Sequence, residues 1–250
     1  MILFLILILI IFVSILPFFK DFLVTNINNY NNYCHQLEYI VYAFINKKKG
    51  VIRFPFHLYN EKNKSLLKYY EKNHNIKIKK EYWLLNNYYR NNDFSSPLSF
   101  NKFFLKRKER FIYLSRGNSK RRKIINEEYL INFLKNKIKN IEIVKFDKKT
   151  TFLEQAEIFS NCKLFITLHG AGLANMYYMP ENSHVIELTP KNSYNHNFNN
   201  IAKKLKINHY YLDIKNHQKS KEVYRYPRDS FLTINKKEMS QLENYIDKII

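Results

Sequence analysis

The chain has 250 residues, enough for one large or two small domains with a hydrophobic core. Hydrophobic residues make up 46% of the chain and aromatic residues 16%, which excludes a disordered polyelectrolyte despite a formal net charge of +21. The positive charge favours anionic partners such as a nucleotide, a membrane surface or nucleic acid.

The N-terminal segment, residues 2–19, is apolar and carries no charge before Lys20. As a helix with a rise of about 1.5 Å per residue, it would span about 27 Å, close to the thickness of a hydrocarbon core. It lacks the basic start and the small-x-small site of a cleaved signal peptide, so we expect an uncleaved single-pass membrane anchor over residues 1–19. Its flanks leave the orientation open. The basic body favours a cytosolic domain, whereas the glycosylation site at Asn63-Lys64-Ser65 favours a lumenal one.

Residues 20–30 are expected to form a stalk, after which helix and strand patterns alternate. In the first half we expect helices over residues 35–45 and 64–72 and strands over residues 51–54, 76–80 and 81–85. In the second half we expect strands over residues 110–115, 141–146, 164–168, 185–188 and 210–214. The helices between and after them begin after Asn126, Thr151, Gly172, Asn197 and Asn235. Such alternation predicts βαβ units and parallel sheets.

Three helix starts carry capping signals. Thr151 with Glu154, and Asn235 with Glu238, match the capping-box pattern, in which the first side chain and the one three residues later each accept a backbone N–H. Asn126 is also suited to cap the helix that follows it.

Between the strand that ends at His169 and the strand over residues 185–188 lies a glycine turn, Gly170-Ala171-Gly172, followed by Leu173. Such a turn directs backbone N–H groups and a helix N-terminus at a bound anion, usually a phosphate. Glycine allows a diphosphate to approach the backbone closely. The alternative interpretation is a tight turn without a ligand.

Several blocks resemble glycosyltransferase family 61 in order and spacing. They are Phe111–Arg116, Arg121–Glu128, Phe152–Ala156, and His169–Leu173 with Glu187, with a looser similarity at Asn32–Glu38. The resemblance extends over about residues 110–212. The family includes secretory-pathway protein O-linked GlcNAc transferases and plant xylosyl- and arabinosyltransferases.

The resemblance implies an α/β fold with two Rossmann-like lobes of GT-B type. Residues 31–109 would form an acceptor-side lobe, which is short for such a lobe, and residues 110–250 a lobe that binds the nucleotide sugar. The implied reaction moves a sugar from a nucleotide diphosphate sugar, UDP-linked, to a protein or glycan hydroxyl with inversion. In a eukaryote, the implied location is the endoplasmic reticulum or Golgi membrane.

The sequence contains no Asp-x-Asp, the pattern with which many transferases hold a divalent metal on the diphosphate. We therefore expect a site without a metal or resident cofactor, in which cations and helix dipoles stabilise the diphosphate. Arg116 and Arg122 with the backbone of residues 170–173 are the first candidates, although a solvated basic turn is the simpler alternative.

Other residues in these blocks allow two interpretations each. Asn126 is either a helix cap or a donor contact, His169 binds phosphate or positions the turn, and Glu187 binds the ribose hydroxyls or is structural. The full expected donor-binding set is Arg116, Arg122, Asn126, Glu127, His169, Gly170, Ala171, Gly172, Leu173 and Glu187. On the acceptor side, His35 and Glu38 are candidate general bases.

The two cysteines, Cys34 and Cys162, have no metal-ligand spacing, so we expect free buried thiols, with a disulfide as the alternative.

Two other functions compete with transfer. One is a degenerate family member that binds sugar or nucleotide without turnover, which the short N-terminal half favours. The other is a nucleic-acid-binding protein, suggested by the charge and by 20 Tyr and 20 Phe residues. No helix-turn-helix, zinc finger or aromatic RNA-binding signature is present, so we expect no nucleic-acid partner.

Overall fold

A computed structural model describes residues 51–55, 61–74, 77–81, 108–117, 119, 122–147, 149–191, 193, 196–218 and 229–250. The expected anchor and stalk, the helix over residues 35–45, the strand beyond Glu81, and the candidate bases His35 and Glu38 lie outside these residues. Within the described ranges, no helix has the length and apolar character needed to cross a membrane.

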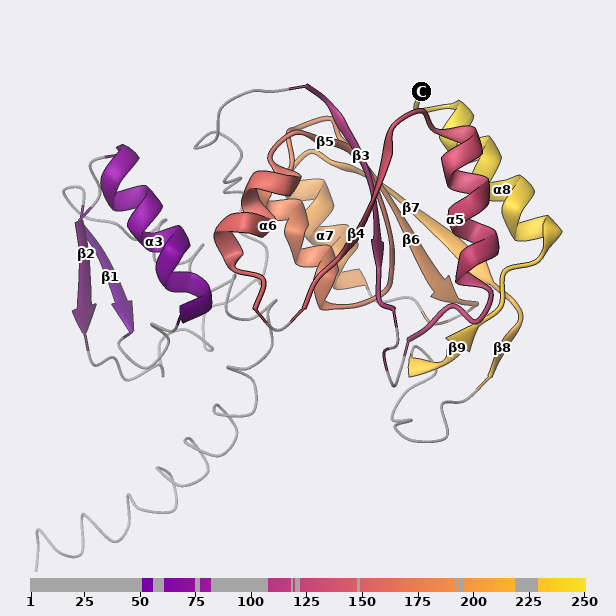
Figure 1. The fold of residues 1–250 in the computed structure, drawn as a ribbon, viewed down its shortest axis with the longest axis horizontal. Coiled ribbons are helices and arrows are strands. Elements are labelled where there is room, and N and C mark those ends of the chain that lie inside the picture. The colour runs from indigo at the N-terminus through magenta and orange to yellow at the C-terminus, as the bar shows by residue number, and fades with distance from the viewer. Residues whose placement is uncertain are drawn as a thin grey trace, which may run out of the picture.

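The central feature is a five-stranded parallel sheet in the order β4-β3-β5-β6-β7 (Figure 1). It contains every strand expected in the second half, namely β3 (Arg110–Ser115), β4 (Ile141–Lys145), β5 (Cys162–Leu168), β6 (His184–Pro190) and β7 (Asn208–Ile214). The chain passes from β3 out to β4 and then back across β3 to β5. The strand order therefore reverses between β3 and β5, where an open parallel sheet has a crevice at the carboxyl ends of its strands.

Helices cover both faces of this sheet, as the alternation predicts (Figure 1). One face packs against α5 (Glu127–Lys137) and α8 (Lys236–Asp247). The other packs against α6 (Phe152–Phe159), α7 (His196–Lys204) and a 3-10 helix, η3 (Ala171–Tyr178). Successive strand residues alternate between the two cores, so Ile112 lies in one and Tyr113 in the other.

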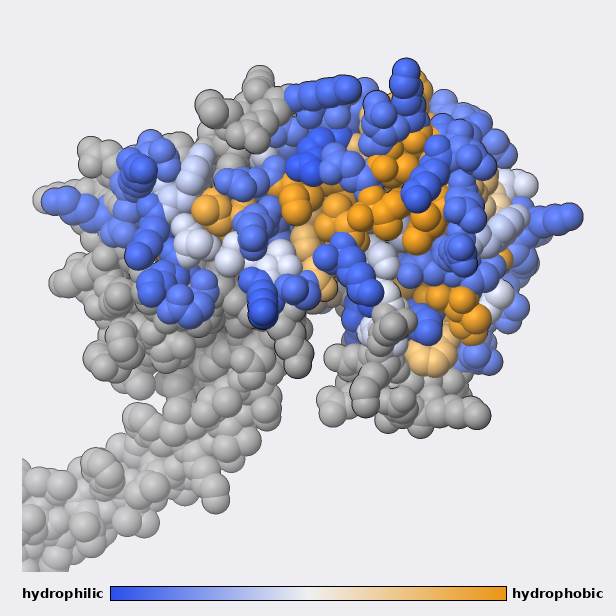
Figure 2. All heavy atoms as spheres, in the orientation of Figure 1, coloured by the Kyte–Doolittle hydropathy of each residue, from blue (hydrophilic) through white to orange (hydrophobic). Residues whose placement is uncertain are grey.

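The edge strand β4 is less covered than its neighbours. Ile141 and Ile143 are only partly buried, whereas Ile112 and Ile166 in the inner strands are fully buried. In Figure 2 apolar residues gather over this part of the molecule, framed by hydrophilic ones. Partial exposure is expected of a strand that pairs on one side only.

Both capping boxes are confirmed. Thr151 Oγ1 accepts from the Glu154 N–H at 3.2 Å, while the Thr151 N–H donates to the Glu154 carboxylate at 2.6 Å. Asn235 and Glu238 make the same reciprocal contacts before α8. Asn126 is the N-cap residue of α5, as expected, but its side chain makes no cap hydrogen bond to the helix. Instead its amide donates to the Ile234 carbonyl at 2.7 Å and accepts from the Ile234 N–H at 3.0 Å, which ties α5 to the segment before α8.

The described part of the first half is one βαβ unit, with β1 (Val51–Pro55) and β2 (Lys77–Glu81) parallel and α3 (Glu61–His74) between them. Leu66 and Leu67 of α3 are fully buried in the core that also contains α6. The α/β class is thus confirmed, while a separate acceptor-side lobe over residues 31–109 stays a prediction.

Three smaller observations complete the fold. The short helix after the glycine turn is 3-10 rather than α. The antiparallel pair of β8 (His217–Gln218) and β9 (Phe231–Leu232) was not expected, because two-residue strands are too short to show an alternating pattern. Cys162 is a free, buried thiol, as expected, and Cys34 lies outside the described residues.

Candidate functional site

A cavity of about 300 Å³ opens at the carboxyl ends of β3, β4 and β5, where the strand order reverses. Its apolar walls are formed by Leu114, Phe146, Phe152 and Leu168. The other lining residues come from the ends of β3 and β5, from the loop before α6, from α6 itself and from the start of η3. They are Ser115, Arg116, Ser119, Asp147, Thr150, Gln155, Thr167, Ala171 and Gly172.

Two arginines converge on Gly170 beside this cavity. Gly170 has a φ of 154°, a backbone conformation that favours glycine. A Cβ at this position would collide with the guanidinium of Arg116 and would lie 3.2 Å from Nη1 of Arg122. The absence of a side chain at residue 170 therefore makes room for two cationic groups next to the N-terminus of η3. The structure brings these three residues of the expected donor-binding set together.

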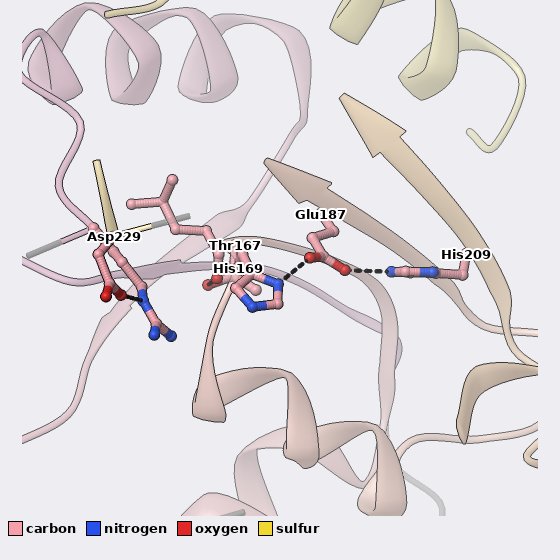
Figure 3. A network of polar contacts seen from close by, with 7 residues as sticks. Thr167, His169, Glu187, His209 and Asp229 are labelled. Atoms are coloured by element: carbon pink, nitrogen blue, oxygen red, sulfur yellow. Dashed lines mark hydrogen bonds and ion pairs between the residues drawn. The ribbon is translucent and has the colours of Figure 1, made fainter. Parts of the chain in front are cut away.

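Arg122 is held by a buried carboxylate that the sequence did not indicate. Its Nε donates to Asp229 Oδ1 at 2.7 Å, and the Asp229 side chain is 0% exposed (Figure 3). This bond uses only Nε, so it orients the guanidinium while neither Nη group takes part in the hydrogen bond to Asp229. The two residues are 107 positions apart, and no local pattern relates them.

The start of η3 offers backbone donors. Its first hydrogen bond runs from the Leu173 N–H to the Gly170 carbonyl at 3.0 Å, so the N–H groups of Ala171 and Gly172 have no acceptor within the helix. Both residues line the cavity. Leu173 does not fit its expected role as a donor contact, because its N–H is used in this bond and its side chain is fully buried.

Close packing against a neighbouring strand also explains why residue 172 is a glycine. A Cβ at this residue would lie 2.7 Å from Cδ2 of Leu114. The glycine therefore allows η3 to pack closely against β3, in addition to any role in the approach of a ligand.

A buried polar chain, His169–Glu187–His209, runs from the end of β5 through the middle of β6 to the start of β7 (Figure 3). Nδ1 of His169 lies 2.5 Å from Glu187 Oε1, and Nε2 of His209 lies 3.0 Å from Glu187 Oε2 without hydrogen-bond geometry. The side chains are 5%, 0% and 1% exposed for His169, Glu187 and His209. The expected contact of Glu187 with ribose hydroxyls is not what this geometry favours, because the carboxylate is enclosed between two imidazoles.

The charge state of Glu187 follows from these neighbours. Burial alone would raise the pKa of its carboxyl, but the hydrogen bond from His169 and the proximity of His209 hold that pKa below its ordinary value. An ionised carboxylate accepts from Nδ1–H of His169 and fixes the ring, whose other nitrogen points away from Glu187 (Figure 3). Glu187 thus positions His169 at the glycine turn.

Glu127 and Asn126 are engaged in contacts that hold the fold. Tyr113 and Ser115 donate to the two Glu127 carboxylate oxygens at 2.7 and 3.0 Å, which joins the end of β3 to the start of α5. Burial, followed by the charge and hydrogen bond of Glu127, raises the pKa of Tyr113 well above its ordinary value. Asn126 is paired with Ile234, and neither Asn126 nor Glu127 lines the cavity. These contacts favour structural roles for both residues over the expected donor contacts.

Gln155 is the polar residue of α6 that faces the cavity. It is 6% exposed, and its side-chain amide makes no hydrogen bond to the residues that the structure describes. Its neighbour Glu154 is used in the capping box. Among the described residues, no group of three or more His, Cys, Asp and Glu side chains could hold a metal ion.

Comparison with known proteins adds the family. The family model described as Glycosyltransferase 61 matches residues 17–186. EGF domain-specific O-linked N-acetylglucosamine transferases of Canis lupus familiaris and Gallus gallus are each 39% identical over 70 residues, and that of Bos taurus is 39% identical over 69 residues. Each match covers 27% of this chain and only 13% of the relative. Because the family model matches well over half of its residues, this chain belongs to glycosyltransferase family 61.

Proposed function

We propose that the protein transfers a sugar from a nucleotide diphosphate sugar, UDP-linked, to a hydroxyl of a protein or glycan. One observation carries the proposal: Arg116 and Arg122 converge on Gly170 at the N-terminus of η3, beside the cavity where the strand order reverses. Guanidinium groups and unpaired backbone N–H groups are the donors that bind phosphate oxygens most strongly. Membership of the family and the transferase activity for which its relatives are named support transfer as the reaction.

The proposed reaction is a single displacement with inversion. The acceptor oxygen bonds to the anomeric carbon as the bond from that carbon to the phosphate oxygen breaks, and the leaving UDP takes the electron pair. The negative charge that develops on the diphosphate is stabilised by Arg116, Arg122 and the N–H groups of Ala171 and Gly172. His169, positioned by Glu187, lies beside the glycine turn and donates to phosphate when both ring nitrogens carry a proton, because its Nδ1–H is given to Glu187. This arrangement requires no metal ion.

The acceptor hydroxyl must lose its proton as the new bond forms. His35 and Glu38 are the proposed general bases, on the acceptor side of the donor site. Both lie outside the described residues, so the proposal rests on the sequence similarity around them.

Binding and turnover test the proposal together. Full-length protein in detergent is titrated with UDP by calorimetry and is incubated with radiolabelled UDP-sugars, and hydrolysis and transfer are measured. Arg116→Ala and Arg122→Ala should weaken UDP binding, whereas Lys135→Ala, which removes a positive charge from the exposed face of α5, should not. Unchanged affinity in both arginine variants would place the donor elsewhere. Binding without hydrolysis or transfer would support the alternative of a family member without turnover.

We also propose that residues 2–19 anchor the protein in the endoplasmic reticulum or Golgi membrane of a eukaryotic cell. The full-length protein should stay in the pellet after alkaline carbonate extraction, and its recovery in the soluble fraction would contradict the anchor. A mass decrease in Asn63→Gln would show that Asn63 is glycosylated and hence that the domain is lumenal.

A further inference from the structure

We infer that the cavity between β3, β5 and α6 is the subsite for the nucleobase of the donor, and that Gln155 recognises the edge of a uracil ring. This inference rests on the proposed donor function and deepens it. It assigns the part of the donor that the cavity takes and names a residue that determines specificity.

The position of the cavity links it to the diphosphate. Arg116, Ala171 and Gly172 line the cavity and also belong to the proposed diphosphate site. One ligand can therefore occupy both places, with its phosphates at these three residues and an attached group against the wall formed by Phe146 and α6.

The polar groups of the cavity are mostly engaged within the protein. The Thr150 N–H and hydroxyl donate to Asp147 Oδ1 at 2.8 and 3.0 Å, and the Thr167 hydroxyl donates to the Leu114 carbonyl at 3.1 Å. The amide of Gln155 makes no such bond to the described residues, although the residue is only 6% exposed. Its amide atoms are not among the fully buried polar atoms without a partner, so they face the open space of the cavity, where they are available to a ligand.

The apolar walls decide which part of the donor fits. Leu114, Phe146, Phe152 and Leu168 would leave the hydroxyls of a sugar ring without hydrogen-bond partners. A pyrimidine has two apolar faces suited to such walls and to stacking on a phenylalanine ring. Its single polar edge matches one amide, because the Gln155 carbonyl accepts from N3–H of uracil while the Gln155 NH₂ group donates to the adjacent uracil carbonyl. A volume of about 300 Å³ lies at the lower end of the range for ligand pockets and is large enough for a nucleobase.

A modified nucleotide tests the contact directly. Calorimetry on the full-length protein compares UDP, UDP methylated at N3 of uracil, and inorganic pyrophosphate. Methylation removes the N–H that Gln155 is proposed to accept, so it should weaken binding to the wild type by roughly 5- to 150-fold, the range for one bidentate base contact. Gln155→Leu should weaken UDP binding by a similar factor, should be insensitive to methylation, and should bind pyrophosphate as the wild type does.

Two further variants make the result specific. Gln155→Glu keeps the size of the side chain but cannot donate to the uracil carbonyl, so it should also weaken UDP binding and serves if the leucine variant does not fold. Gln241→Leu is the matched control, because Gln241 is exposed on α8 and bonds to Tyr245. It should bind all three probes unchanged. Melting curves confirm that each variant is folded.

The inference is overturned if the wild type binds UDP and N3-methyl-UDP equally, or if Gln155→Leu loses pyrophosphate affinity as much as UDP affinity. Tighter binding of CDP, GDP or ADP than of UDP would also overturn the assignment of uracil. A wild type that binds neither UDP nor pyrophosphate would instead refute the proposed donor site as a whole, so the two failures are distinguishable.

Discussion

Glu187 lies 2.5 Å from Nδ1 of His169, and the register of the sheet is what brings the two side chains together. Thr167 pairs with Glu187 across β5 and β6. His169 is two residues beyond Thr167, so it leaves the end of β5 on the same face of the sheet. The imidazole at the glycine turn is therefore oriented by a buried carboxylate on the neighbouring strand.

The Glu187 carboxylate should make the free energy of unfolding depend on pH in the acidic range. Its folded-state pKa is lowered by His169 and His209 despite burial, so its contribution is fully present above its ordinary pKa of about 4.5 and is lost as the pH falls through the lower folded-state value. In urea unfolding between about pH 3 and pH 7, Glu187→Gln should therefore lose less stability on acidification than the wild type. Other carboxyls, including the exposed Asp147, are common to both proteins and cancel in the comparison. Equal acid dependence would show that Glu187 is not ionised in the folded protein.

Arg122→Ala should reduce both nucleotide affinity and stability. Loss of one charged hydrogen bond to phosphate weakens binding by about 1.5–3 kcal/mol, or roughly 10- to 150-fold. The variant also removes the ion pair of Arg122 with the buried Asp229 carboxylate, which should lower the free energy of unfolding by up to about 3–5 kcal/mol. Calorimetry with UDP and urea unfolding measure the two effects.

Arg110→Ala is the matched control for Arg122→Ala. It breaks the ion pair with Glu142 at the other end of β3, where both side chains are partly exposed, so it should cost less stability and leave UDP affinity unchanged. Equal loss of affinity in Arg110→Ala and Arg122→Ala would indicate a general effect of charge rather than a contact.

Gly172→Ala should strain the contact between η3 and β3. The added Cβ would lie 2.7 Å from Cδ2 of Leu114, and such overpacking costs about 1–3 kcal/mol. Because the clash is with the end of a side chain, Leu114→Ala in the same protein should recover part of that loss, which a double-mutant cycle of unfolding free energies would measure. Strict additivity of the two substitutions would rule out this contact as the reason for the glycine.

UDP binding and any transfer activity should survive EDTA, because the chain contains no Asp-x-Asp and the proposed diphosphate ligands are arginines and backbone N–H groups. The measurement is UDP affinity and UDP-sugar turnover before and after chelation, with manganese added back. Loss of activity in EDTA and its return with manganese would refute the metal-independent account.

Local signals in the sequence were sufficient for much of the fold. The strands over residues 110–115 and 141–146, both capping boxes and the glycine turn after His169 are encoded by hydrophobic periodicity and by hydrogen bonds between residues three or four apart. The family resemblance added Arg116 and Arg122 as neighbours of that turn, and the structure places both against Gly170.

The tertiary structure alone decided which side chains face the site and which hold the fold. Asp229 meets Arg122 across 107 positions, and His209 reaches Glu187 only because β7 pairs with β6. The Glu127 carboxylate accepts hydrogen bonds from Tyr113 and Ser115. These contacts depend on strand order, register and the packing of helices on the sheet, which arise from burial over the whole chain. Periodicity and capping report only on neighbours along the backbone, so they determine the elements but not which distant polar groups become partners.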